Sequence, residues 1–201
     1  MTKHTFQITH ENEIDNIIPI NQNSDQSTQT LPLFVYISGG CQKLFGINPR
    51  EISKDSEVDL STSTPLSLWR CELMRSDPRG KHLFLFTHAT TFFSIVVFQE
   101  ELKLDACLRQ FLDELLFRLE DSIKIPEPLK ISIATIKGNP RGLITTMNQI
   151  MYECDVALKL NIKSYENLEY RINHSLRSKI FFEPHEEFVK ISHSSKAFTS
   201  S

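Results

Sequence analysis

Residues 82–98 read HLFLFTHATTFFSIVVF, and this stretch decides the fold. The aromatic and β-branched residues at 82–87 and 91–98 predict two strands separated by a short break. Residues 66–74 alternate and predict a third strand, joined to the first by the turn signal DPRG at 77–80. Three strands with short connections predict an antiparallel meander. Because the last of them is apolar on both faces, it is expected to be a central strand covered on both sides.

Two further strands and three helices are expected around this meander. LPLFVYIS at 31–38 predicts a strand, followed by a helical turn over 41–45 that Gly46 closes, and LKISIATI at 129–136 predicts a fifth strand. The helices are expected at 105–121, after Asn139-Pro140, and after the cap Ser164. Residues 180–182 and 188–191 suggest short extended segments. The predicted fold is α+β, a single domain with an antiparallel sheet of about five strands packed by about three helices.

The chain is expected to carry polar ends. Residues 21–30, NQNSDQSTQT, contain no apolar side chain and cannot bury enough surface to offset the entropy of ordering. The predicted organisation is therefore a polar N-terminal extension and linker over 1–30, an α+β domain over 31–192, and a C-terminal tail over 193–201. Whether the apolar residues before the linker dock on the domain stays open.

Composition indicates a soluble protein of a reducing compartment. The 201 residues carry a net charge of −3 and are 40% hydrophobic, which argues against a generally basic nucleic-acid or membrane-surface protein. The four cysteines form no C-x-x-C pair and are expected to be buried free thiols. With no secretory signal and no apolar run of about 20 residues, the expected location is the cytoplasm, with no membrane contact.

Four pieces of the chain resemble a family of small bacterial proteins classed as a domain of unknown function. They are CQKLFG at 41–46, the Trp69 strand leading into KHLFLFTHATTFFSIVV at 81–97, NPRGLITTMNQIMYEC at 139–154, and YENLEYRINHSL at 165–176. The resemblance covers roughly residues 33–191. It implies a bacterial origin and one α+β domain, and it brings no established reaction, cofactor or partner.

The sharpest chemical hypothesis joins a histidine to a polar helix strip. His88, flanked by threonines, is a candidate catalytic base; the alternative is a turn histidine whose ring bonds a nearby backbone carbonyl. Lys137, Arg141 and Asn148 are candidates for anion binding, since Arg141 stands at a predicted helix N-terminus and Asn148 follows two turns later. The alternatives are an internal ion pair for Arg141 and a solvated helix face for the strip.

A second hypothesis concerns the predicted hairpin tip at 75–82. Arg75, Arg79 and Lys81 are candidates for contacting nucleic-acid phosphates, although such charges are more often simply solvated. The His and Cys spacings match no metal site, and no nucleotide or cofactor motif is present, so neither a metal nor a cofactor is expected.

The expected function is a non-catalytic binding or regulatory protein of the bacterial cytoplasm, acting by protein contact or ligand capture. Its expected partner is another protein, and an accessory role in a phage-defence, counter-defence or toxin–antitoxin system would fit its small size. One alternative is an enzyme acting on a phosphate-bearing small molecule or RNA through His88 and Arg141. Another is a nucleic-acid binder that uses the 75–82 tip. The oligomeric state is left open.

Overall fold

The fold is described from a computed structural model, which places residues 6–8, 32–48, 57–59, 68–74, 82–100, 102–119, 129–137, 141–160, 164–175 and 183–194. The strands are β1 (Phe6–Ile8), β2 (Pro32–Ile37), β3 (Glu57–Asp59), β4 (Leu68–Met74), β5 (His82–His88), β6 (Ser94–Gln99) and β7 (Leu129–Lys137). The helices are α1 (Gly39–Phe45), α2 (Leu104–Leu119), α3 (Arg141–Lys159), α4 (Tyr165–Asn173) and α5 (Pro184–Ser194).

The strands of the described residues form one mixed sheet in the order β1-β7-β2-β4-β5-β6, and β3 pairs with β7 outside this path. The pairs β1–β7, β7–β2, β2–β4 and β3–β7 are parallel, whereas β5 is antiparallel to both β4 and β6. The α+β class is confirmed, but the expectation of a purely antiparallel sheet is wrong. Helices α1 and α2 lie in the chain between parallel strands, and such crossovers are what parallel pairing requires.

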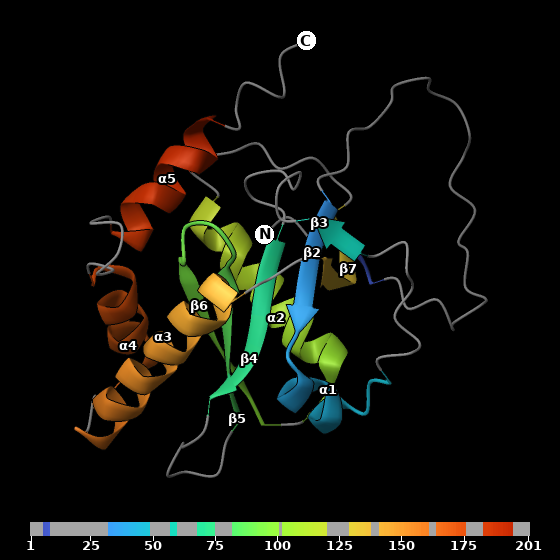
Figure 1. The fold of residues 1–201 in the computed structure, drawn as a ribbon, viewed down its shortest axis with the longest axis horizontal. Helices are drawn as coiled ribbons and strands as arrows, with labels where there is room; N and C mark the ends of the chain where they lie inside the picture. Colours follow the sequence, from blue (N-terminus) through green and yellow to red (C-terminus); the bar gives the residue numbers. More distant parts are fainter. Residues whose placement is uncertain are drawn as a thin grey trace.

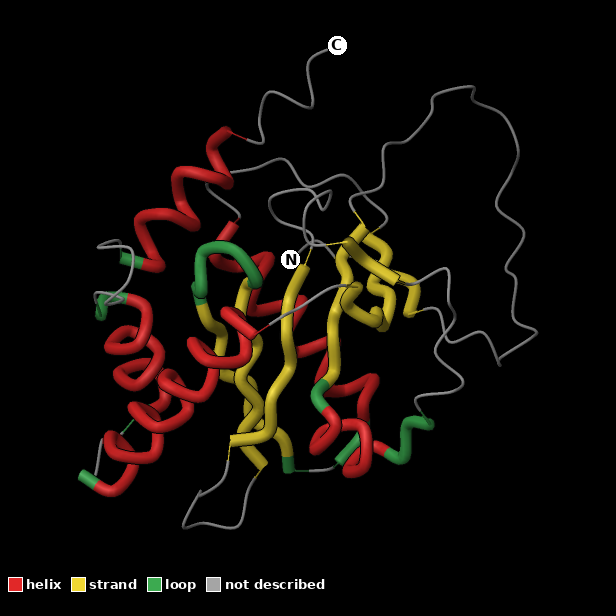
Figure 2. The backbone as a smooth tube through the Cα atoms, viewed as in Figure 1, coloured by secondary structure: helices red, strands yellow, loops and turns green. Residues whose placement is uncertain are grey.

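Helices cover both faces of the sheet (Figures 1 and 2). On one face, α1, α2 and part of α5 pack with Trp69, Phe84, Phe86 and their neighbours in a single apolar cluster. On the other face, α3 and α4 pack against Leu83, Leu85 and Val96. Because successive residues of a strand point to opposite faces, β5 and β6 must be apolar at nearly every position to serve both clusters. This explains the continuous apolar runs at 82–87 and 91–98.

The turn between β5 and β6 is built around a backbone that few side chains adopt. Phe92 has φ of 60°, in the left-handed region, and its N–H donates to the carbonyl of His88 at 3.0 Å. The N–H of His88 in turn donates to the carbonyl of Phe93 at 2.8 Å. The turn thus carries the chain directly from one strand of the predicted meander to the next.

Strand β6 lies at the end of the sheet order, which corrects the expectation that residues 91–98 form a central strand. Its two faces are buried as expected, because Ile95 and Val97 belong to the α2-side cluster and Val96 to the α3-side cluster. The edge of β6 that pairs with no other strand faces α4. An apolar run therefore marks coverage by helices, and it does not by itself distinguish a central strand from a covered edge.

Three further differences concern elements in segments expected to be irregular. Helix α5 replaces the extended segment expected at 188–191, and with α1 it brings the helices of the described residues to five. Strand β3 is not among the strands predicted from the sequence. Strand β1, inside the predicted extension, pairs with Leu129, Lys130 and Ile131 of β7. Among the placed residues, no helix combines the length and the hydropathy needed to cross a bilayer.

Candidate functional site

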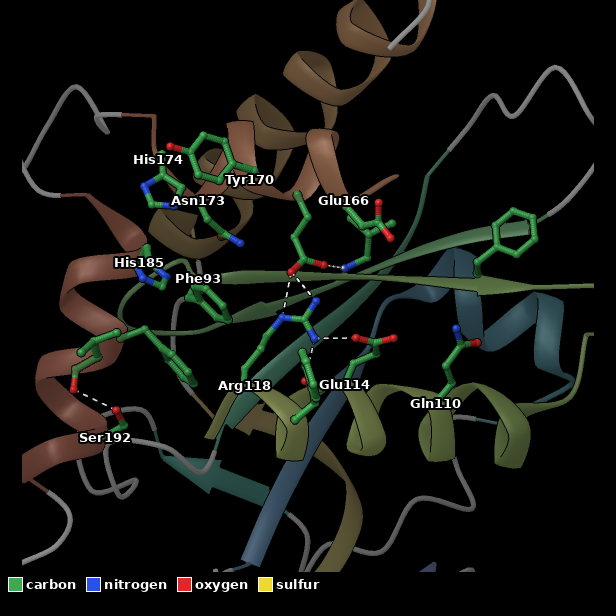
Figure 3. Close-up of a pocket in the computed structure, with 16 residues that line it drawn as sticks. Phe93, Gln110, Glu114, Arg118, Glu166, Tyr170, Asn173, His174, His185 and Ser192 are labelled. Carbon is green, nitrogen blue, oxygen red and sulfur yellow. Dashed lines mark hydrogen bonds and ion pairs between the residues drawn. The ribbon is translucent and has the colours of Figure 1, made fainter. Parts of the chain in front are cut away.

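A pocket of about 550 Å³ lies where α2, β6, α4 and α5 meet (Figure 3). We call it the edge pocket, because it runs along the outer edge of the sheet. Aromatic side chains make most of its apolar lining, and a few charged groups lie among them. The lining residues on α2 and β6 and in the turn before β6 are Phe93, Val96, Phe98, Gln110, Glu114, Phe117 and Arg118. Those on and next to α4 and on α5 are Glu166, Glu169, Tyr170, Asn173, His174, His185, Phe188, Val189 and Ser192.

Helix α4 forms one wall by pairing its side chains with the edge of β6. Ser164 begins the helix as its N-cap, with its hydroxyl accepting from the N–H of Asn167 at 3.2 Å. The side chain of Asn173 accepts from the N–H of Ser94 and donates to its carbonyl, both at 2.7 Å. One turn earlier, Glu169 Oε2 accepts from the N–H of Val96 at 3.0 Å. Two side chains of α4 thus satisfy backbone groups that an edge strand otherwise exposes.

An ion-pair network crosses the pocket from α2 to α4. The Arg118 guanidinium lies 2.5 Å from Glu169 Oε1 and 2.6 Å from Glu114 Oε2, and it also donates to the carbonyl of Glu114 at 2.6 Å. Burial alone would lower the pKa of Arg118, but the two carboxylates outweigh it and raise that pKa. For Glu169 burial prevails, so its pKa is raised above 4.5 even though Arg118 and the Val96 N–H lower it. The network therefore fastens α4 to α2 across the strand.

Aromatic rings and two histidines close the other end of the pocket, where α4 meets α5. Phe93 stacks on Phe188 with ring centroids 4.3 Å apart, and Tyr170 stacks on His174 at 4.1 Å. His174 Nδ1 contacts Glu183 Oε1, just before α5. The pKa of His185 is lowered by burial and by His174, 4.9 Å away between ring centroids, and two nearby glutamates oppose this shift. This end of the pocket is thus lined by stacked aromatic rings and two imidazoles.

The candidate base His88 lies in the core and does not line this pocket, although its ring packs against Phe188, which does. Its side chain is 1% exposed, and its ring packs 5.2 Å from Trp69 and 5.9 Å from Phe188 between centroids. Its Nδ1 accepts from the N–H of Thr91 at 3.2 Å and lies 2.9 Å from the Thr91 hydroxyl. A ring nitrogen that accepts from a backbone N–H carries no proton, so the ring is neutral. His88 therefore helps to hold the turn through Thr91, and its role as a catalytic base stays a prediction.

The structure does not bring His88 and the helix strip together. Asn148 is exposed on α3, which packs on the opposite face of the sheet from the cluster around His88. Arg141 is the first residue of α3 and Lys137 the last of β7, but their side chains lie outside the described residues. The composite pocket with a base, an anion anchor and an amide is therefore not formed, and anion binding by Lys137 and Arg141 stays a prediction.

The candidate nucleic-acid contacts Arg75, Arg79 and Lys81 lie outside the described residues. Arg70, one strand length away, is 8% exposed and does not add to a basic surface. Its guanidinium pairs with Glu72 at 2.8 Å and lies 5.4 Å from the ring centroid of Tyr36. Nucleic-acid binding through the hairpin tip therefore stays a prediction as well.

All four cysteines are buried free thiols, which confirms the expectation. Burial raises the pKa of Cys71, and its hydrogen bonds to the thiols of Cys107 and Cys41 raise it further. For Cys41, the bond from Cys71 prevails over burial and lowers the pKa, with help from Ser38. Within the placed part of the chain, no group of three His, Cys, Asp or Glu side chains is arranged to hold a metal ion.

Comparisons with protein-family models, with curated proteins and with solved structures find no significant match to this chain. The resemblance to an uncharacterised bacterial family therefore stays a prediction.

None of the candidate site residues predicted from the sequence lines the edge pocket. Arg118 follows Glu114 by four residues, and Asn173 follows Glu169 by four, so each pair shares one side of its helix. That spacing is visible in the sequence and indicates polar sides for both helices. It does not indicate that the two sides converge on one strand edge, because this depends on the packing of α2 and α4 around β6.

Proposed function

We propose that this protein is a non-catalytic binding protein that captures a small organic ligand in the edge pocket. The proposed location is the bacterial cytoplasm. There the ligand-bound form would bind a partner protein and so report the presence of the ligand. The observation that carries the proposal is the composition of the pocket: about 550 Å³ walled by aromatic rings, with a few charged groups held in place among them. A volume of this size lies within the range of small-molecule sites.

Three of the pocket's charged groups, Arg118, Glu114 and Glu169, favour binding over chemistry because they hold the walls together. Glu169 uses one carboxylate oxygen on Arg118 and the other on the N–H of Val96. Arg118 makes four hydrogen bonds to Glu114 and Glu169. Groups committed in this way orient the pocket and do not need to exchange protons with a ligand. A preformed pocket of this type binds with little reorganisation.

Two exposed aromatic residues at the pocket provide the test. Phe117 on α2 is 74% exposed and Tyr170 on α4 is 66% exposed, so each can be shortened with little effect on folding. We expect 2-phenylethanol or 2-phenylethylamine to bind saturably, with a Kd on the order of millimolar for ligands of this size. Phe117→Ala is expected to weaken the binding about two- to tenfold, because one aromatic wall is lost. Isothermal titration calorimetry measures both values.

Tyr152→Ala serves as the matched control. Tyr152 is 69% exposed on α3 and does not line the pocket, so its removal should leave the Kd unchanged. Equal weakening in Phe117→Ala and Tyr152→Ala would show that the probes bind elsewhere. Failure of both probes to saturate the wild-type protein would also contradict the proposal.

A further inference from the structure

We infer that the edge pocket selects small organic cations, namely a protonated amine carried on an aromatic or aliphatic body. This inference rests on the proposed function and specifies its ligand class. The inference is based on a set of aromatic rings that lie beside several carboxylates. The one guanidinium of the lining, that of Arg118, is already paired with Glu114 and Glu169.

The lining has a negative balance. It contains three carboxylates, from Glu114, Glu166 and Glu169, and one guanidinium, from Arg118. These four groups alone give a formal charge of −2 in a space partly shielded from water. Glu166 projects from the first turn of α4 toward the pocket in Figure 3, across from Glu114 and Arg118 on α2. A cation entering between the two helices would therefore meet carboxylates from both sides.

The one guanidinium of the lining is poorly placed to take an anion. Its Nε and Nη2 donate to Glu169 Oε1 at 2.9 and 2.5 Å, and its Nη1 donates to the carbonyl and the carboxylate of Glu114, each at 2.6 Å. A ligand carboxylate or phosphate would have to displace one of these carboxylates, which would then be left without its partner. The cost of an unpaired, partly buried charge disfavours that exchange. The pairing of Arg118 therefore disfavours the binding of anionic ligands.

The rings of the lining add attraction for a positive charge. An ammonium group over an aromatic face is attracted by the quadrupole of the ring, and the attraction increases as water is excluded. Phe117 and Tyr170 stand on the two helices that flank the strand edge, and Phe93 and Phe188 continue the aromatic surface inward. An aromatic or aliphatic body can therefore bury itself among the rings while its ammonium group lies near Glu114 or Glu166.

A series of three probes of similar shape tests the inference. These are 2-phenylethylamine, which is a cation at pH 7.5, neutral 2-phenylethanol, and the anion phenylacetate. We expect the cation to bind about tenfold more tightly than the alcohol, and phenylacetate more weakly than both. Titration calorimetry at 20 mM and at 300 mM salt should show a Kd that rises with salt for the cation and stays unchanged for the neutral alcohol.

Substitution of the exposed carboxylate separates charge from shape. Glu166→Gln keeps the side-chain size, and we expect it to reduce the preference for the cation over the alcohol about threefold or more, while the Kd of the alcohol stays unchanged. Asp113→Asn is the control, because Asp113 is exposed on α2 next to Glu114 and does not line the pocket.

The outcomes separate the inference from the function on which it rests. Equal affinity for amine and alcohol, with both weakened by Phe117→Ala, would overturn cation selectivity and leave ligand capture standing. An equal loss of cation preference in Glu166→Gln and Asp113→Asn would attribute the preference to overall charge and would overturn the inference as well. If none of the three probes saturates, ligand capture itself fails.

Discussion

The side-chain amide of Asn173 binds the backbone of Ser94 as a neighbouring strand would. Its Oδ1 accepts from the Ser94 N–H and its Nδ2 donates to the Ser94 carbonyl, each at 2.7 Å. A helix side chain thereby satisfies both backbone groups of one residue at the sheet edge, and Glu169 satisfies the next outward-facing N–H, that of Val96. The same contacts fix α4 beside β6 and so define one wall of the edge pocket.

The first prediction concerns this edge. Asn173→Leu should lower the free energy of unfolding by about 2–4 kcal/mol, because two buried backbone groups lose their partner. Asn167→Ala, an exposed position on the same helix, should change it by less than about 0.5 kcal/mol. Urea unfolding followed by circular dichroism measures both. Equal stability of the two variants would mean that the amide does not cap the strand edge.

The second prediction concerns the ion-pair network. Arg118→Met should destabilise the fold by about 2–3 kcal/mol at pH 7, below the cost of a fully buried pair because its side chain is 24% exposed. The loss leaves the carboxylate of Glu169 without its guanidinium, and the pKa of that carboxyl is already raised by burial. Arg171→Met, on the exposed side of α4, is the control and should have little effect.

The cost of Arg118→Met should depend on pH in a defined direction. A buried carboxyl with a raised pKa destabilises the folded state above that pKa, where it must ionise, and the penalty disappears as the pH falls below the unfolded value of about 4.5. The difference in stability between wild type and variant should therefore shrink between pH 7 and pH 4.5. A difference that stays constant or grows over this range would contradict the account.

The third prediction concerns the histidine end of the pocket. The folded protein holds the pKa of His185 below 6.5, chiefly by burial and by His174, so in acid the unfolded chain takes up a proton that the folded chain resists. Stability should consequently fall as the pH decreases through 6.5 toward the folded pKa. In His185→Gln this fall should be smaller, as thermal unfolding between pH 7.5 and pH 5 would reveal. Parallel curves for the two proteins would exclude the effect.

Local patterns in the sequence predict much of the fold correctly. Alternation and apolar runs identify the strands that begin near Leu68, His82 and Ser94, and Ser164 and Gly46 mark helix ends as their capping chemistry implies. The burial of Cys71, Cys107 and Cys154 follows in the same way from their apolar neighbours. These features are set by residues close together in the chain, which is why the sequence alone reveals them.

What the sequence does not reveal depends on long-range packing. Strand direction follows from where α1 and α2 cross the sheet, so the meander at β4–β6 gives no indication that β2 and β7 run parallel to β4. Helix α5 could have been found from Pro184 at its first position and Glu186 and Glu187 in its first turn, but the β-like side chains around Phe188 outweighed these signals. The edge pocket is formed by residues of four elements, so no single segment of the sequence predicts it.

The most direct test of ligand capture is a two-dimensional amide NMR titration of the full chain with 2-phenylethylamine. The account predicts saturable shifts, with a single Kd, for amides around the pocket, such as those of Phe98, Gln110 and Val189, and no comparable shifts in α1 or in α3 around Cys154. Shifts that are scattered over the surface, that increase without saturation, or that centre on α3 would contradict it.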